Sequence, residues 1–156
     1  TRGNNVYGER QYPEKLIPKF ICLLQQNKKC TIHGTGENLR SFIHVKDVVN
    51  AFDIILNKGD IGTIYNIGSN DEYSVINVAK ILINKLKPDI KYNNLVEFVK
   101  DRDFNDWRYN IDTSKLESLG WKQKICFETG INIVIDWYTK TDINLHWNIQ
   151  KQVIYK

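Results

Sequence analysis

The sequence predicts a mixed α/β fold in a single domain. Amphipathic segments with helical spacing alternate along the chain with short runs typical of strands. The length of 156 residues matches one ordinary domain. No internal repeat, low-complexity stretch or linker-like boundary divides the sequence. We therefore expect residues 1–156 to form one domain.

Two helices with a strand-rich segment between them are predicted in the first half. Residues 13–29 carry an apolar stripe at helical spacing, and Pro18 suits the first turn, where its missing N–H group is harmless. Residues 30–45 contain two strand-like pieces, so they form either a hairpin or a strand and a loop. Residues 46–59 predict a helix that ends at Gly59. The apolar face expected for this helix consists of Val48, Val49, Phe52, Ile55 and Leu56.

A buried strand and a capped helix are predicted next. Residues 62–69 are an almost continuous apolar run, which is typical of a strand buried on both faces. Residues 74–88 have an amphipathic pattern that indicates a helix. Ser74 is a favourable N-cap for this helix, and Pro88 sets its end.

The last third of the chain predicts one strand and two helices. Residues 94–112 begin as a strand and turn polar in the middle. Asp112 or Thr113 is expected to cap a short helix over residues 114–120. Residues 127–141 carry the last amphipathic pattern, so we expect a final helix there.

The composition is typical of a soluble globular chain, with 42% hydrophobic and 26% charged residues. No apolar run approaches the roughly 20 residues that a membrane-spanning helix needs. The net charge of +4 is spread along the sequence and indicates a solvated surface more than a nucleic-acid footprint. We therefore expect neither a membrane segment nor a nucleic-acid partner.

Three cysteines, Cys22, Cys30 and Cys126, are too few and too widely spaced for a disulfide framework or a zinc site with paired ligands. This pattern favours a reducing compartment, and we expect a cytoplasmic protein. The sequence contains no methionine and begins at Thr1. We expect it to be a piece of a longer protein.

Several common kinds of catalytic site have no support in the sequence. "GTGENLR" has two glycines but lacks a third and precedes no helix, so it is a poor dinucleotide fingerprint. The three histidines have no metal-ligand spacing, so we expect no metal site. A Gly-x-Ser-x-Gly elbow for acyl transfer is also missing from the sequence.

Polar residues suited to anions lie at the expected ends of several elements. The planar fork of arginine fits a pair of phosphate oxygens, and asparagine can donate to phosphate or sugar oxygens without adding charge. Together such residues would form a pyrophosphate cradle, although each one alone has an ordinary interpretation, such as an arginine paired with a neighbouring aspartate. Sequence spacing leaves both readings open. The residues concerned are Asn5, Lys15, Arg40, Asn66, Arg102 and Asn105.

Four motifs in this order resemble one enzyme family. They are "NNVYGERQYPEKLIPKFI", "IHGTGENLRSFIHVKDVVNAF", "GTIYNIGS" and "VKDRDFNDWRYNIDTSKLESLGW". The chain resembles the C-terminal half of nucleotide-sugar 4,6-dehydratases, extended short-chain dehydrogenase/reductase enzymes that act on dTDP-glucose or UDP-glucose. The resemblance implies an α/β substrate-binding part without its Rossmann half. Strands near 1–8 and 62–68 would be the last strands of the Rossmann sheet.

The resemblance also implies which residues hold the substrate. Asn5 falls where the family contacts the substrate diphosphate, and Arg40 falls on the arginine that grips it. Lys15 and Leu16 border the substrate. Val6 stands where bacterial relatives have a second asparagine, so that contact of theirs is not carried over.

Further positions follow from the same resemblance. Asn66 and Arg102 match substrate-binding positions, and Asn105 replaces a histidine of bacterial relatives. The strand that lines the nucleobase is matched by Thr31, Ile32 and His33.

By the same resemblance, the complete enzyme would oxidise carbon 4 of the sugar with NAD, eliminate water across carbons 5 and 6, and return the hydride to carbon 6. The family's glycine-rich NAD loop, its Tyr-x-x-x-Lys pair and its acidic pair are not in this sequence. We therefore expect no catalytic residue in this chain, NAD held mainly by a missing Rossmann half, and a homodimeric complete enzyme.

Two other readings stay open at this point. The chain could belong to a nucleotide-sugar epimerase or decarboxylase of the same superfamily. It could instead be a non-catalytic nucleotide-binding module that folds alone with a closed core. A part of a larger enzyme should expose apolar surface where the other half docks, and its terminal strands should lack neighbours.

Overall fold

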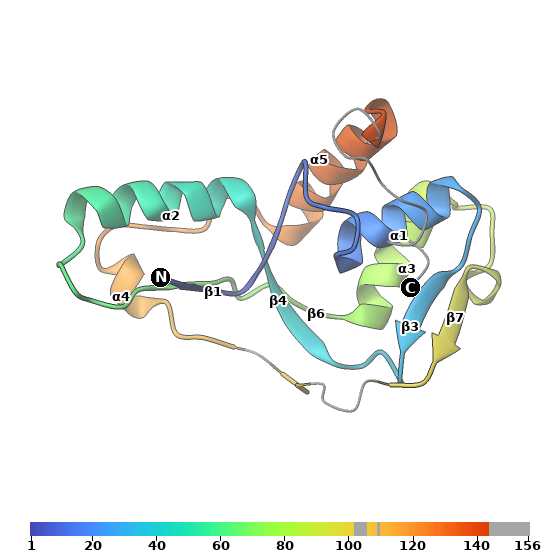
Figure 1. Ribbon diagram of the computed structural model, residues 1–156, viewed down its shortest axis with the longest axis horizontal. Helices are drawn as coiled ribbons and strands as arrows, with labels where there is room; N and C mark the ends of the chain where they lie inside the picture. The colour runs from blue at the N-terminus through green and yellow to red at the C-terminus, as the bar shows by residue number, and fades with distance from the viewer. Residues whose placement is uncertain (102–105, 109, 144–156) are drawn as a thin grey trace.

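The computed structural model describes residues 1–101, 106–108 and 110–143. The predicted mixed α/β class is confirmed. In chain order the elements are β1 (Arg2–Gly3), β2 (Asn5–Tyr7), α1 (Leu16–Gln25), β3 (Cys30–His33), β4 (Leu39–His44), α2 (Val45–Lys58), β5 (Asn66–Ile67), β6 (Glu72–Ser74), α3 (Val75–Leu86), the 3-10 helix η1 (Tyr92–Asn94), β7 (Val96–Val99), α4 (Ser114–Glu117) and α5 (Phe127–Lys140). Figure 1 shows an elongated molecule, with α2 and α4 at one end, α3, β3 and β7 at the other, and β4 running between them.

The strands of the described residues form three small sheets. The central sheet has the order β2-β4-β6, in which β2 runs parallel to β4 and β6 runs antiparallel to it. β1 pairs in parallel with β5, and β3 pairs in parallel with β7. Because β3 and β4 lie in different sheets, residues 30–45 form two strands joined by a loop and not a hairpin.

The larger hydrophobic core lies between α1, α3 and α5. Pro18 lies in the first turn of α1, as predicted. Ser74 caps α3, because its hydroxyl oxygen accepts the N–H of Asn77 at 3.1 Å. Side chains with almost no exposed surface fill this core, including Phe20, Ile21, Leu24, Ile32, Leu82, Phe127 and Tyr138.

Acidic side chains hold the loop that leads into α5. The Asp47 carboxylate accepts the N–H groups of Lys124 at 3.1 Å and Ile125 at 2.9 Å. Asp71 accepts the N–H of Phe127 at 3.0 Å. These bonds fix where α5 begins relative to α2 and to β6.

The cap of α4 comes from Asp112. Its Oδ1 atom accepts the N–H of Ser114 at 2.9 Å, whereas the hydroxyl of Thr113 lies 2.6 Å from a carboxylate oxygen of Glu117. Of the two cap candidates, the aspartate therefore makes the backbone hydrogen bond.

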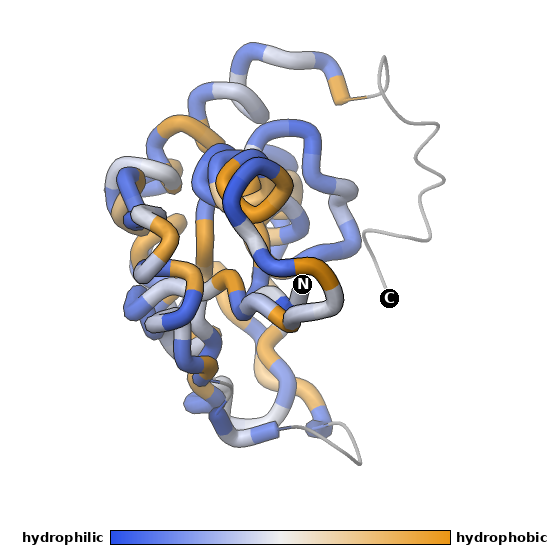
Figure 2. Tube along the Cα trace, turned by 90° about the vertical axis from the view of Figure 1, so that its left-hand side faces the viewer, coloured by the Kyte–Doolittle hydropathy of each residue, from blue (hydrophilic) through white to orange (hydrophobic). Residues whose placement is uncertain are grey.

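The apolar stripe predicted for α2 is divided in the structure. Val48 is buried in a second, smaller core, and Ile55 packs against it. Val49, Phe52 and Leu56 are instead 60%, 48% and 85% exposed. Their spacing places them on one side of the helix, next to the side that packs Val48 and Ala51 into the smaller core. Figure 2 faces this end of the molecule and shows hydrophobic stretches along the chain nearest the viewer.

The strand predicted over residues 62–69 is shorter and less buried than expected. β5 contains only Asn66 and Ile67, and its sheet has only β1 as a partner among the described strands. Tyr65 and Ile67 are buried, but Ile64 is 53% exposed. Burial on both faces was therefore wrong at Ile64, whereas Gly68, further along the run, is buried close to Asn4, Ile111 and Thr113.

Among the described residues, none of the helices combines the length and the apolar character that a membrane span needs. Cys22 and Cys30 are buried free thiols, and Cys126 is an exposed one. Burial raises the pKa of the Cys22 thiol to about 11.

Candidate substrate-binding site

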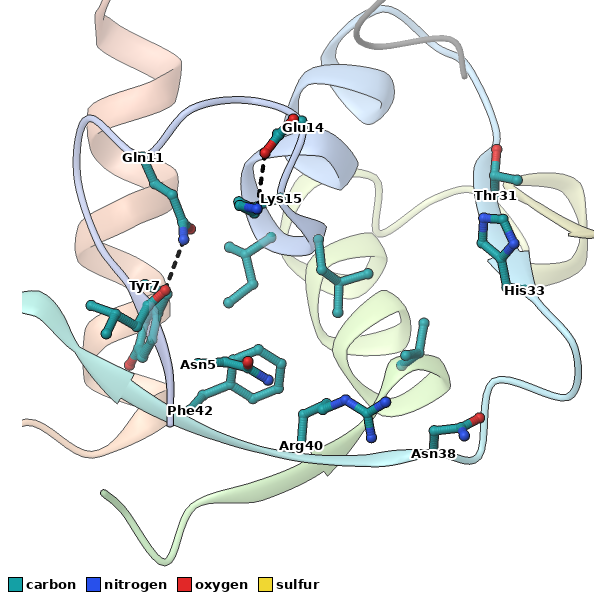
Figure 3. Close-up of a pocket in the computed structure, with 14 residues that line it drawn as sticks. Asn5, Tyr7, Gln11, Glu14, Lys15, Thr31, His33, Asn38, Arg40 and Phe42 are labelled. Atoms are coloured by element: carbon teal, nitrogen blue, oxygen red, sulfur yellow. Dashed lines mark hydrogen bonds and ion pairs between the residues drawn. The ribbon is translucent and has the colours of Figure 1, made fainter. Parts of the chain in front are cut away.

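A cavity of about 610 Å³ opens between α1 and the strands β2, β3 and β4. Figure 3 shows polar side chains converging on it from several elements. Its volume lies in the range usual for pockets that hold small organic ligands. The lining residues are Asn5, Val6, Tyr7, Gln11, Glu14, Lys15, Leu16, Ile17, Thr31, His33, Asn38, Arg40, Phe42 and Val75.

Most of the predicted site residues meet in this cavity. The lining includes Asn5, Lys15, Leu16, Thr31, His33 and Arg40. Two predicted residues lie elsewhere: Ile32 is fully buried in the larger core, and Asn66 donates its side-chain N–H to the carbonyl of Asp112 at 2.8 Å. Arg102 and Asn105 lie outside the described residues.

Strand β4 supplies the floor of the cavity. Alternate residues of a strand face the same side, so Arg40 and Phe42 both line the cavity while Ser41 and Ile43 face away. One guanidinium N–H of Arg40 donates to the carbonyl of Leu39 at 2.7 Å. Figure 3 shows the Arg40 side chain rising from β4 into the space below α1.

The segment before β4 adds a second polar group. The amide N–H of Asn38 donates to the carbonyl of Asp106 at 3.1 Å, and the backbone N–H of Leu39 donates to the carbonyl of Trp107 at 2.9 Å. Both bonds attach the segment after β7 to the start of β4 and so hold one edge of the cavity in place.

The start of α1 closes the opposite side. Lys15 is the N-cap residue of α1, and its side chain makes no capping hydrogen bond. Its ammonium group lies 2.9 Å from the Glu14 carboxylate, and both side chains are mostly exposed. The first N–H groups of a helix have no acceptor within the helix, and they favour an anion placed near them.

Strand β3 forms the far wall. Thr31 and His33 share the face that lines the cavity, whereas Ile32, between them, points into the core. The Nδ1 atom of His33 is buried and has no hydrogen-bond partner among the described residues. A buried polar atom in this condition is suited to a bond with a ligand.

The charges of the cavity favour an anion. Arg40 and Lys15 are cationic, and among the described residues that line the cavity only Glu14 is acidic. Burial raises the pKa of the Tyr7 phenol, which therefore stays protonated at neutral pH. Among the described residues, no group of three or more His, Cys, Asp or Glu side chains could hold a metal ion. The arrangement can bind and orient a polar, anionic ligand.

Some lining residues were not predicted from the sequence. Phe42 had a readable signal, because it lies two residues after Arg40 on a predicted strand and so shares its face. Asn38 lies two residues before Arg40 and had a similar signal. Tyr7, two residues after Asn5 on β2, had the same signal. The other unpredicted lining residues are Val6, Gln11, Glu14, Ile17 and Val75.

Comparison with known proteins finds one matching family model and several similar enzymes. A model of the NAD dependent epimerase/dehydratase family matches residues 1–68. The dTDP-D-glucose 4,6-dehydratase of Dictyostelium discoideum is 46% identical over 169 residues, which cover 88% of this chain and 39% of that protein. A trifunctional UDP-glucose 4,6-dehydratase, epimerase and reductase of Arabidopsis thaliana is 46% identical over 140 residues, which cover 90% of this chain and 21% of that protein.

Solved structures agree with the sequence relatives. The dTDP-glucose 4,6-dehydratase of Streptomyces venezuelae, with NAD and TYD bound, superposes with a TM-score of 0.87 at 31% identity, covering 97% of this chain and 45% of that one. The chain spans about two fifths of the length of the curated dTDP-D-glucose 4,6-dehydratases that it matches. The resemblance seen in the four motifs is thus confirmed: the chain is similar to 4,6-dehydratases over most of its length, and its residues 1–68 match the NAD dependent epimerase/dehydratase family.

Proposed function

We propose that this chain forms the substrate-binding part of a nucleotide-sugar 4,6-dehydratase and grips a nucleoside diphosphate sugar. The observation that carries the proposal is the convergence of Asn5, Arg40 and His33, with the first turn of α1, on one cavity. Cationic and amide donors suit a diphosphate. The relatives support the reaction class, because their names describe 4,6-dehydratases.

Each side chain has a proposed role within this grip. The Arg40 fork binds diphosphate oxygens, and the Asn5 amide adds a neutral donor. Lys15 and Leu16 border the ligand at the start of α1. Ile32 shapes the nucleobase wall through its backbone. The nucleobase lies along the cavity face of β3, against Thr31 and His33, where the unpartnered Nδ1 atom of His33 meets a polar edge of the base.

Asn66, Arg102 and Asn105 keep the substrate-binding roles that the resemblance implies for them. Asn66 lies near α4 and outside the cavity lining, so its role requires either the complete protein or a ligand that extends beyond the cavity.

The residues present do not fit NAD. Gly34 and Gly36 lie in the loop before β4 and not before a helix, so they cannot direct a helix N-terminus at a pyrophosphate. NAD binding in the complete enzyme therefore falls mainly to the part of the protein outside this chain. The residues of this chain bind and orient the sugar nucleotide.

The apolar face of α2 is the proposed docking surface for that other part. Val49, Phe52 and Leu56 are exposed on one side of the helix, and Ile61 and Ile64, in the segment that follows it, are exposed as well. Exposed apolar groups of this extent usually mark an interface. The occupant is the same enzyme's Rossmann half, because the matched relatives are more than twice as long as this chain.

Docking is tested in the complete enzyme by comparing Phe52→Ser with Phe98→Ser. The two phenylalanines are similarly exposed in this chain, at 48% and 53%, but Phe98 lies on β7 at the opposite end. We expect Phe52→Ser to lower the free energy of unfolding by about 2–3 kcal/mol, the value of a buried phenylalanine, and Phe98→Ser to have little effect. Equal effects of the two substitutions contradict the docking.

The function is tested with the complete enzyme, NAD, and either dTDP-glucose or UDP-glucose. Formation of a 4-keto-6-deoxy sugar from one of them supports the proposal and identifies the nucleotide, which the relatives leave open. If neither sugar reacts although the folded enzyme holds NAD, the dehydratase assignment fails and an epimerase or decarboxylase becomes the better reading. A homodimer, also expected, is checked by light scattering on the same sample.

A further inference from the structure

The segment that joins β2 to α1 is the least regular wall of the cavity. It contributes Gln11, Glu14 and Lys15 to the lining, yet it contains neither helix nor strand. Its backbone therefore lacks the ladder of hydrogen bonds that holds β3 and β4 in place. Its position depends on individual contacts.

Gln11 is where those contacts meet. Its side-chain N–H donates to the carbonyl of Val6 on β2 at 2.7 Å, the bond drawn in Figure 3. Its own carbonyl accepts a hydrogen bond from the hydroxyl of Tyr138. The residue is thus attached to β2 on one side and to α5 on the other. A turn then leads the segment into α1, in which the backbone N–H of Lys15 donates to the carbonyl of Tyr12 at 3.2 Å.

Tyr138 is itself firmly held. It is 2% exposed and lies at the end of the buried stripe of α5. The Gln25 side chain, at the end of α1, donates to the Tyr138 carbonyl at 2.9 Å. At the other end of α5, Gly130 leaves room for the Tyr7 ring, where a Cβ atom would collide with the phenol oxygen. α5 is therefore fixed against both β2 and α1.

We propose that Tyr138 is a positioning residue for the nucleotide-sugar site, because its hydroxyl holds the Gln11 carbonyl and with it the wall that carries Glu14 and Lys15. No residue of α5 lines the cavity, so Tyr138 acts through the segment and not by touching the ligand. This inference rests on the proposed function, since the ligand whose affinity it affects is the sugar nucleotide.

The test compares Tyr138→Phe with Tyr65→Phe in the complete enzyme. Tyr65 is a matched control: it is also 2% exposed, and its hydroxyl also bonds the backbone by accepting the N–H of Asp60 at 3.0 Å. Tyr65 does not line the cavity. Both variants keep the aromatic ring and lose one neutral hydrogen bond, so their losses of thermal stability should be similar.

We expect Tyr138→Phe to raise the Kd for dTDP or UDP about fivefold, the value of one neutral hydrogen bond, and to raise KM with little change in kcat. Amide hydrogen exchange over residues 9–16 should become faster in Tyr138→Phe, without any ligand present. Tyr65→Phe should leave both the Kd and this exchange unchanged.

The outcomes separate the inference from the function on which it rests. An unchanged Kd and unchanged exchange in Tyr138→Phe overturn the positioning role, as do equal changes in the two variants. A wild-type enzyme that is folded but binds neither nucleotide nor sugar nucleotide overturns the proposed function, whatever the exchange shows.

Discussion

Replacing Arg40 by alanine tests the anion grip most directly. Arg40 lies on the cavity floor at a partly buried position of β4. Two unit charges about 4 Å apart interact with about 4 kcal/mol at an effective dielectric constant of about 20, and charge-assisted hydrogen bonds measured by mutation contribute about 1.5–3 kcal/mol. We therefore expect Arg40→Ala in the complete enzyme to weaken binding by about 2–3 kcal/mol, or about 30- to 140-fold.

Titration calorimetry with the nucleoside diphosphate sugar measures this change. Lys140→Ala removes a cation that is 73% exposed and pairs with Asp136 at 2.7 Å, so it serves as the charge control and should change Kd by less than about twofold. Arg40→Lys keeps the positive charge but loses the planar guanidinium fork, so its Kd should lie between those of the wild type and Arg40→Ala. Unfolding free energy should change by less than about 1 kcal/mol in Arg40→Ala. An unchanged Kd for Arg40→Ala refutes the assignment.

Three further predictions concern a second contact, a cap and a buried histidine. Asn66→Ala should weaken binding about fivefold, as expected for one neutral contact; lost stability with unchanged Kd would assign Asn66 to its bond with Asp112 instead. Ser74→Ala should lower the free energy of unfolding by about 1 kcal/mol in urea titrations, because α3 loses its cap; no change would contradict the capping role. Burial lowers the pKa of His44 from its ordinary value of 6.5, so the unfolded chain takes up a proton first as the pH falls. Stability should therefore decrease as the pH falls below about 6.5, and His44→Gln should show a flatter pH dependence; parallel curves for the two proteins would contradict this.

Local signals predicted the ends of α2 and α3 well, whereas α1 is shorter at both ends than the predicted 13–29. Ser74 and Pro88 bracket α3, and Gly59 follows the last residue of α2. These signals depend on backbone groups within one turn of the residue, so they need no information from the rest of the chain. The alternation of Arg40 and Phe42 on β4 is local in the same sense.

Burial of α2 and β5 was predicted less well, since burial depends on what lies across the element. Periodicity identified Val49, Phe52 and Leu56 as apolar positions, but no local signal says whether their partner lies in this chain. The same holds for Gln11, whose place at the cavity follows from α5, more than a hundred residues later.

The exposed apolar surface and the cavity belong to different cores. The apolar residues that line the cavity belong to the larger cluster or pack against it, except Val6, which packs against the smaller one. Val49, Phe52 and Leu56 are instead exposed on α2, the helix that contributes Val48 and Ala51 to the smaller cluster. Because a core residue transmits strain mainly to its neighbours, changes on the α2 face should act on docking and on stability more than on the grip itself. Substitutions at Arg40 should instead act on ligand binding more than on docking or stability. In the double variant Phe52→Ser with Arg40→Ala, the loss of stability and the loss of ligand affinity should each equal the sum of the losses in the single variants. A strong departure from this additivity would show that the two cores do not act separately.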